Sequence, residues 1–331
     1  MDSKATLSSV STVGIVGAGG MARVHADAWR RIGVKVAVFS RSGGSDLLLD
    51  GETEAQSLLE LVSDVDLLDV CSPTPTHLEA AAAGIDAGIP VVCEKPLALT
   101  VADADRLVAL AKSAGVPLFP AHVVRYFPAY VAARDALLSG ALGEPAVARF
   151  VRMGEFPHWS DWFDDDSQSG GIMMDQMIHD LDMAAWLLGP VLSVHAVSHH
   201  ATSAPARTAH VTLTHQSGAI STATGVWGAP GLTFATRFHV AGSEGRLDHD
   251  SRDTPSVTFD GGRRGVESRR PAEAVGDPYE NQLRDVLTVL RDGGTPRTTP
   301  TEGAYAVRIA RAAIESSVSG ATVTLEGSGS C

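Results

Sequence analysis

Cysteine, basic residues and long apolar runs are all scarce in this chain of 331 residues. The three cysteines, Cys71, Cys93 and Cys331, form no CxxC pair and their number is odd, which argues against a disulfide scaffold and a zinc site. The first residues, MDSKATLSSVS, lack the apolar run of a signal peptide. No segment approaches the ~18 uninterrupted apolar residues of a membrane span. We therefore expect a cytoplasmic protein that binds neither a metal nor a membrane.

Positive charge is also in deficit, with 26 Lys and Arg residues against 39 Asp and Glu residues and a formal net charge of −13. Nucleic acids and anionic membrane surfaces attract proteins through a positive field, so neither is an expected partner. A small anionic ligand in a local basic pocket remains compatible with this charge. The length and the 44% content of hydrophobic residues predict two domains with substantial cores.

The first third of the chain alternates short apolar runs with helical patterns. Such alternation predicts right-handed βαβ crossovers and a parallel sheet, which is the Rossmann arrangement. The segment 41–52 is short and rich in Gly and Ser, so a full helix is not expected after the second strand. Strands are predicted at 12–17, 34–40, 65–72, 89–94 and 116–122, and helices at 20–33, 55–63, 76–87 and 100–113.

The pattern changes after about residue 125, where alternating apolar and polar residues predict a mostly antiparallel sheet with helices on one face. The tetrapeptide QSGA at 216–219 predicts a hairpin turn between two of its strands. We therefore predict an α/β protein with a Rossmann domain at 1–124 and a C-terminal α/β domain at 125–331. Strands are predicted at 191–200, 207–216, 219–228, 233–242 and 255–261, and helices at 128–139, 171–188, 277–291 and 302–318.

A glycine motif follows the first predicted strand and opens a helix. In GIVGAGGMA, Gly17 permits a tight turn, Gly19 lets the backbone approach a pyrophosphate, and Ala22 allows close packing of helix and strand. Backbone N–H groups at the helix start, including those of Gly20 and Met21, then face the phosphates. The position of the motif in the first strand–helix unit predicts a dinucleotide site.

The end of the second predicted strand lacks the carboxylate that accepts hydrogen bonds from an adenosine ribose diol. Ser40 and Arg41 stand there. Serine and arginine can bind a 2′-phosphate, which favours NADP over NAD, although Arg41 is equally compatible with a solvated loop position.

Two further candidate segments end buried strands, at the edge where ligands of open α/β sheets bind. In CEKP, Glu94 and Lys95 end one strand, and Lys95 is either a catalytic lysine or a surface charge. In SPTPTH at 72–77, the backbone can pass the nicotinamide, while His77 also fits the start of a helix. The predicted cofactor contacts here are Ser72, Pro73, Thr74, His77, Glu94 and Lys95.

The stretch MMDQMIHDLD at 173–182 places three polar residues along one stripe of a predicted helix. At roughly 100° per residue, Asp175, His179 and Asp182 lie within about 60° of one another. An amphipathic surface helix explains the polar arc, but Ile172, Met183 and Trp186 fall inside the same arc, and such a mixed stripe fits a cleft wall better. Asp175 one turn before His179 suits a general base and its orienting acid, whereas no third ligand at clear spacing supports a metal.

Together these stretches resemble the glucose–fructose oxidoreductase / inositol dehydrogenase / rhizopine-catabolism (Gfo/Idh/MocA) family. The resemblance covers nearly the whole chain and depends on GIVGAGGMA, CEKPLA, VVRYFPAY and SGGIMMDQMIHDLD. It implies a Rossmann domain, a nicotinamide cofactor, and oxidation or reduction at a carbon of a sugar or cyclitol. It also implies a homodimer or homotetramer formed through the C-terminal sheet.

The resemblance also implies residue roles. Lys95 matches a lysine that contacts substrate and nicotinamide ribose, His179 matches the general acid/base, and Asp175 matches an acid that binds substrate hydroxyls. Arg125 matches a cleft arginine, and Ser169 and Met177 stand where the family usually has glycine, so altered packing or a narrower pocket is expected. Trp159 and Trp162, beside the acidic segment 164–166, are candidate substrate contacts, although this segment also fits a helix cap.

Two other functions fit the same build. One is a glycoside-processing enzyme that oxidises its sugar transiently, and the other is a cofactor-sensing regulator that has kept only the fold. Lys95, Asp175 and His179 together argue against the regulator.

Overall fold

The computed structural model describes residues 10–158, 160–201, 206–261, 266–267 and 276–325. Trp159 and Cys331 lie outside the described residues. The chain forms two compact units, one of Met1–Tyr126 with Gly276–Ala304 and the other of Phe127–Val275 with Tyr305–Cys331.

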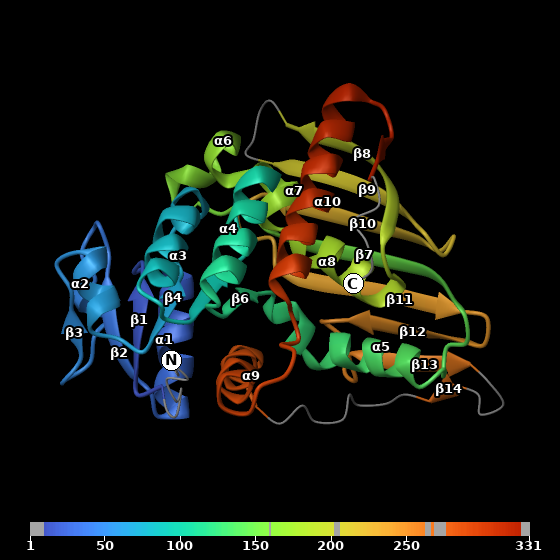
Figure 1. Cartoon of the computed structure of the whole chain (residues 1–331). Coiled ribbons are helices and arrows are strands. Elements are labelled where there is room, and N and C mark those ends of the chain that lie inside the picture. Colours follow the sequence, from blue (N-terminus) through green and yellow to red (C-terminus); the bar gives the residue numbers. More distant parts are fainter. Residues whose placement is uncertain (1–9, 159, 202–205, 262–265, 268–275, 326–331) are drawn as a thin grey trace. The chain divides into compact units, whose positions relative to one another are not determined.

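The first unit contains a parallel sheet of six described strands in the order β3-β2-β1-β4-β5-β6 (Figure 1), which confirms the predicted Rossmann arrangement. The two-residue strand β3 was not predicted, and only a short 3₁₀ turn at Ser45–Leu47 stands between β2 and β3. The bounds are β1 Thr12–Val16, α1 Gly20–Ile32, β2 Lys35–Phe39, β3 Thr53–Glu54, α2 Leu58–Ser63, β4 Leu67–Val70, α3 His77–Asp86, β5 Val91–Glu94, α4 Val101–Ala114 and β6 Leu118–Ala121.

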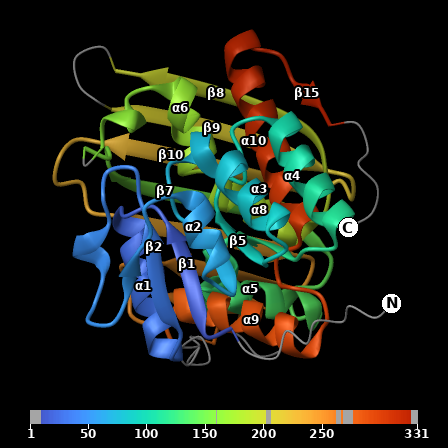
Figure 2. The ribbon, with the colours of Figure 1, turned by 60° about the vertical axis from the view of Figure 1, so that its left-hand side comes forward.

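Helix α9 (Pro278–Asp292) packs in this first unit, although it comes late in the sequence and was predicted within the domain 125–331. Leu283 and Val286 on its apolar stripe join the core that contains Trp29 of α1 and Phe119 of β6. A parallel sheet needs cover on both faces, and α9 supplies part of that cover. Figure 2 shows α1 beside β1 and β2.

The second unit contains a sheet of nine described strands in the order β14-β13-β12-β11-β7-β10-β9-β8-β15. The pairing is antiparallel except between β7 and β10, so the predicted mostly antiparallel sheet is confirmed. The predicted turn at 216–219 joins β9 to β10, and the His215 N–H donates to the Ala219 carbonyl. The strand bounds are β7 Pro145–Glu155, β8 Val191–His200, β9 Arg207–His215, β10 Ile220–Gly228, β11 Ala235–Gly242, β12 Gly245–Asp250, β13 Val257–Gly261, β14 Val266–Glu267 and β15 Val323–Thr324.

Burial alternates along these strands, so one face of the sheet belongs to the core. On β7, for example, Ala148, Phe150 and Arg152 are buried while Arg149 is exposed. Helix α10 is anchored to β8 by the Tyr305 hydroxyl, which accepts from the Val191 N–H, and by Ser316 Oγ, which accepts from the Ala196 N–H. The other helices of this unit are α5 Pro128–Leu138, α6 Asp166–Ser169, α7 Gly171–Asp175 and α8 Ile178–Leu188, and α10 spans Pro300–Ser319. Among the described residues, none of the helices has the length and apolar character needed to traverse a bilayer.

Candidate active site

The glycine motif forms an open turn between β1 and α1. Gly17 has φ +109°, and a Cβ built on it would lie 2.9 Å from the Cys71 carbonyl oxygen and from the Ser72 nitrogen. Only glycine fits there, because the turn passes directly against the chain leaving β4. Cβ atoms built on Gly19 and Gly20 would meet nothing within 4 Å. The start of α1 therefore presents exposed backbone that fits a pyrophosphate.

The end of β2 lies beside this turn, since the Gly17 N–H donates to the Phe39 carbonyl at 2.8 Å. Ser40 and Arg41 follow directly. Arg41 Nη2 lies 2.8 Å from Glu79 Oε2 of α3, and both side chains are more than two-thirds exposed. The Arg41 guanidinium thus lies just after the end of β2, as the sequence requires, and forms an exposed ion pair with Glu79.

The turn after β4 is shaped by His77, which begins α3 as the sequence suggested. Its buried ring lies between two carbonyl oxygens, with Nε2 2.8 Å from Ser72 O and Nδ1 2.8 Å from Pro96 O. Burial lowers the pKa of His77. Both ring nitrogens contact backbone carbonyls, so the ring bridges two loops, and the contact with the cofactor predicted for His77 stays a prediction. Ser72 Oγ pairs with Thr76 Oγ1 at 2.6 Å.

Lys95 follows β5, the strand next to β4, and its side chain is partly exposed. Glu94 is buried, and its Oε2 accepts the Lys95 backbone N–H at 3.0 Å. The Glu94 side chain points into the first unit, where Oε1 lies 3.1 Å from His25 Nε2. The Glu94 side chain therefore supports the backbone of Lys95 from inside, and its predicted contact with the cofactor stays a prediction.

Arg125 is only 2% exposed in the short turn that follows β6. Its Nη1 donates to the Arg297 carbonyl at 2.8 Å and lies 3.0 Å from Glu302 Oε1. These partners belong to the same unit and hold the start of α10. Arg125 thus tethers this turn to the start of α10, and its contact with substrate stays a prediction.

In the second unit, the single helix predicted over 171–188 is two helices. The Met177 N–H donates to the Ile172 carbonyl, five residues earlier, at 2.9 Å, and this wide turn separates α7 from α8. Wide turns of this kind are frequent at functional sites. Asp175 ends α7 and His179 lies in the first turn of α8, both partly exposed, whereas Asp182 is buried. The predicted stripe is therefore corrected to the pair Asp175 and His179.

Local sequence explains how this region folds. Gly170 and Gly171 both have positive φ, at +74° and +68°, which turns the chain from α6 into α7. Helix α8 is fixed to the sheet by Asp180, whose carboxylate accepts from Arg152 Nε at 3.0 Å and from Nη2 at 2.8 Å. Both side chains are buried. This bidentate pair holds the residue next to His179.

The acidic segment before α7 is held by Arg207 at the start of β9. Its guanidinium donates to the Phe163 carbonyl at 3.2 Å and to the Asp164 carbonyl at 3.0 Å, and it pairs with Asp166. It also lies over the Phe156 ring, 5.0 Å from the ring centroid. Trp162, a predicted substrate contact, is partly exposed on this segment.

Both halves of the chain match families of known proteins. Residues 11–122 match the family model described as "Oxidoreductase family, NAD-binding Rossmann fold", and residues 130–248 match the GFO/IDH/MocA C-terminal domain. D-apiose dehydrogenase of Paraburkholderia graminis is 30% identical over 94% of this chain and 89% of that protein. Myo-inositol 2-dehydrogenase of Thermotoga maritima is 30% identical over 95% and 98%.

A solved structure gives the same result for the fold. GenD2 from gentamicin A biosynthesis, in complex with NAD, is 26% identical with a TM-score of 0.84, and the match covers 99% of each chain. The nicotinamide-binding first unit and the C-terminal sheet are thus both those of one group of enzymes, and the chain belongs to the Gfo/Idh/MocA family of NAD(P)-dependent oxidoreductases.

Proposed function

We propose that the protein transfers hydride between a nicotinamide cofactor and a hydroxyl-bearing carbon of a sugar, sugar derivative or cyclitol. The main support is the pair of relatives that match nearly the whole chain, one named for apiose and one for myo-inositol. Lys95 after β5 and the pair Asp175 and His179 provide the side chains that such chemistry requires.

The roles of the side chains follow from their chemistry. When bound, nicotinamide takes the hydride that leaves the substrate carbon. His179 accepts the proton of the hydroxyl on that carbon, and Lys95 stabilises the negative charge that develops on the oxygen. Asp175 binds a neighbouring hydroxyl and orients the ring. In the reverse direction His179 returns the proton.

The test is a screen of purified protein against sugars and cyclitols with NAD and with NADP, followed by the absorbance of the reduced nicotinamide. Turnover of a polyol in solution with one of the free cofactors is the expected result. A protein that keeps its cofactor through desalting and cleaves glycosides without net reduction would contradict the proposal.

For the cofactor we favour NADP(H) over NAD(H). The support is the absence of a carboxylate at residues 40 and 41, together with the position of Arg41. The Arg41–Glu79 pair is exposed and therefore contributes only about 0–1 kcal/mol, so Arg41 can exchange Glu79 for a 2′-phosphate. The phosphate offers a more favourable bidentate partner for the guanidinium.

The cofactor preference is tested by kcat/KM for both cofactors. Wild type should prefer NADP(H), and Ser40→Asp should shift toward NAD(H), because a carboxylate repels the phosphate and accepts from the diol. Glu79→Gln is the matched control: it frees Arg41 and should strengthen the preference for NADP(H). A wild-type preference for NAD(H) would refute the argument.

We further propose a homodimer or homotetramer that uses the exposed face of the nine-stranded sheet, and a cytoplasmic location without nucleic-acid or membrane partners. The support for the interface is that Val197 and Ile220 are about half exposed on this face. The support for the location is that Cys71 and Cys93 are free thiols. Light scattering on the eluting protein tests the assembly, and a monomer at all concentrations would exclude it.

A further inference from the structure

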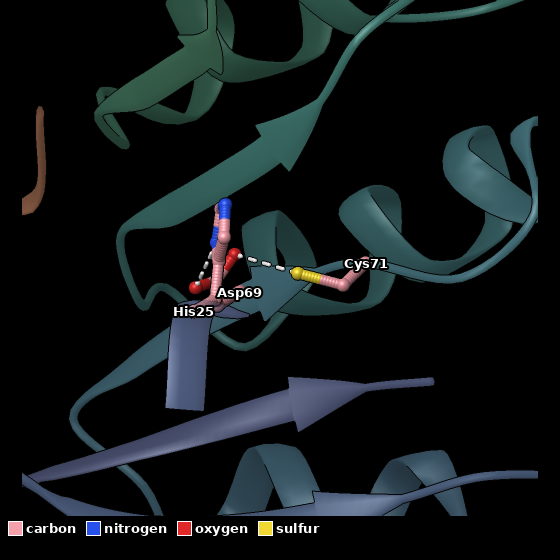
Figure 3. A group of neighbouring side chains, drawn as sticks. All are labelled: His25, Asp69 and Cys71. Carbon is pink, nitrogen blue, oxygen red and sulfur yellow. Dashed lines mark hydrogen bonds and ion pairs between the residues drawn. The ribbon is translucent and has the colours of Figure 1, made fainter. Parts of the chain in front are cut away.

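A histidine that the proposed mechanism does not use lies between two carboxylates inside the first unit. His25 of α1 has no exposed surface. Its Nδ1 is 2.9 Å from Asp69 Oδ2 of β4, and its Nε2 is 3.1 Å from Glu94 Oε1 at the end of β5. Figure 3 shows the His25 ring against Asp69, with Cys71 on the other side of that carboxylate. The ring therefore links a helix to two neighbouring strands.

The surroundings favour a charged ring. Nδ1 is hydrogen-bonded to Asp69, and Nε2 lies at ion-pair distance from Glu94 Oε1 without the alignment of a hydrogen bond. A positively charged ring attracts both buried carboxylates, whereas a neutral ring leaves both carboxylate charges uncompensated. Burial opposes the charge, but Asp69 and the neighbouring groups outweigh it and hold the pKa of His25 well above its usual value. Burial likewise opposes the charge of Glu94, and His25 nevertheless keeps the pKa of Glu94 low. Trp29 Nε1 donates to Asp69 Oδ2 at 2.7 Å and Cys71 Sγ to Oδ1 at 3.5 Å, so Asp69 has further donors of its own.

A metal ion is the competing explanation, since His25, Asp69 and Cys71 place potential ligand atoms within 4.8 Å of one another. A metal ligand must be a neutral imidazole with a free lone pair, and a cysteine ligand must be a thiolate. Here both ring nitrogens face carboxylates, and burial raises the pKa of the Cys71 thiol. The group is therefore built to hold a proton.

The network ends at the backbone of Lys95. Glu94 Oε1 contacts His25, and Glu94 Oε2 accepts the Lys95 backbone N–H. One carboxylate therefore connects the buried ring to the backbone of Lys95. On the other side of Lys95, the Pro96 carbonyl is held by His77. Helix α1, which carries His25, begins at the glycine turn that is proposed to bind the pyrophosphate. The imidazolium of His25 therefore connects this helix to Lys95.

We propose that His25 is a positioning residue for catalysis: its imidazolium holds Glu94, and Glu94 holds the backbone from which Lys95 reaches the substrate. This inference rests on the proposed catalytic role of Lys95. A small displacement of a catalytic group can cost on the order of 10²-fold in rate. Loss of His25 should therefore lower kcat by about 10- to 100-fold, without equal loss of cofactor binding.

The test compares five variants with wild type, of which Lys95→Met is described last. His25→Gln and Glu94→Gln break the same contact from its two ends, and His25→Gln/Glu94→Gln combines them. Trp29→Phe is the matched control, because it removes a buried donor from Asp69 and leaves Glu94 untouched. For each variant one measures kcat, KM for the sugar, the dissociation constant of the reduced cofactor by fluorescence, the thermal midpoint and the zinc content.

The inference predicts a similar loss of kcat in both single variants and little further loss in the double variant, since coupled residues are not additive. Trp29→Phe should lower the thermal midpoint but keep kcat. Equal kcat in His25→Gln, Glu94→Gln and Trp29→Phe would overturn it, as would stoichiometric zinc in wild type. If His25→Gln does not fold, Glu94→Gln against Trp29→Phe decides. The proposed function and the role of His25 fail in different ways. No turnover of any sugar or cyclitol by wild type refutes the proposed function. Full turnover in Lys95→Met refutes the catalytic role of Lys95 on which the inference rests, and an inactive Lys95→Met beside an unaffected Glu94→Gln refutes only the role of His25.

Discussion

Met177 fills the space that a side chain on Gly225 would need. A Cβ built on Gly225 of β10 would lie 2.5 Å from Met177 Cγ and 2.6 Å from its sulphur, and Met177 is completely buried. The methionine that replaces the family's usual glycine is therefore directed against the sheet, which favours the altered packing that the sequence suggested. Bulk at residue 177 and its absence at residue 225 are complementary.

This complementarity predicts the effect of Gly225→Ala. Overpacking at this contact should lower the free energy of unfolding by about 1–3 kcal/mol. The change Met177→Ala in the same chain should recover part of the loss, because it removes the atoms that clash. Urea unfolding of the three variants measures this, and equal losses from Gly225→Ala with and without Met177→Ala would show that the two residues do not compete for space.

The buried pair of Arg152 and Asp180 predicts a second coupling. Asp180→Asn leaves a buried guanidinium without its carboxylate, and removal of one partner of such a pair typically costs about 3–5 kcal/mol. The double variant Arg152→Met/Asp180→Leu should unfold at a higher urea concentration than Asp180→Asn alone, because it buries no unpaired charge. Additive losses in the double variant would mean that the pair is not energetically coupled.

Arg207 predicts an effect on substrate binding. Arg207→Lys keeps the charge but loses the planar fork that contacts the Phe163 and Asp164 carbonyls. The segment that carries Trp162 should then lose order, so KM for the sugar should rise several-fold while the dissociation constant of the cofactor stays constant. Arg237→Lys on β11 is a suitable control, since Arg237 contacts Asp250 in the same sheet but not this segment. An unchanged KM in Arg207→Lys would exclude Trp162 from the substrate site.

The histidines predict how stability depends on pH. The pKa of His25 is raised in the folded protein above its usual value of 6.5. At pH values between these two, His25 is protonated in the folded protein and mostly neutral in the unfolded chain. The stability that His25 contributes is complete below about 6.5 and is lost as the pH rises through its folded pKa. Burial lowers the pKa of His77, His215 and His249, so these residues cost stability as the pH falls below 6.5.

The measurement is the free energy of unfolding of wild type and His25→Gln over this range of pH. The difference between the two proteins should be largest at and below about pH 6.5 and should shrink toward alkaline pH. Both should lose stability on the acid side, because the other three histidines remain. A difference that is constant with pH would mean that His25 is neutral in the folded protein.

Much of the fold could be predicted because it depends on local patterns. Apolar runs between helical segments predicted β1, β2, β4, β5 and β6, and alternation predicted most of the second sheet. Strand β7 was missed because its inward side includes Arg152, which breaks the alternation and is paired there with Asp180, 28 residues later. The break between α7 and α8 was missed because the spacing of its residues fits a continuous helix.

In the candidate site, too, the residues that local sequence reveals could be predicted and those that depend on distant contacts could not. The glycine motif, Lys95 and the pair Asp175 and His179 stand out because their residue types are unusual for their positions. The supporting roles of His25, Glu94 and His77 depend on contacts between residues far apart in the chain. One signal was present, since Asp69 is a carboxylate in the middle of an apolar strand and therefore needs buried donors.

The proposed mechanism depends most directly on His179. The decisive measurement is kcat of His179→Ala and wild type at several pH values, with a sugar or cyclitol that wild type oxidises and with cofactor binding checked by fluorescence. A general acid/base contributes roughly 10²–10⁴-fold, so kcat should fall by that factor while the cofactor still binds. Turnover near the wild-type rate at all of these pH values would contradict the proposed mechanism.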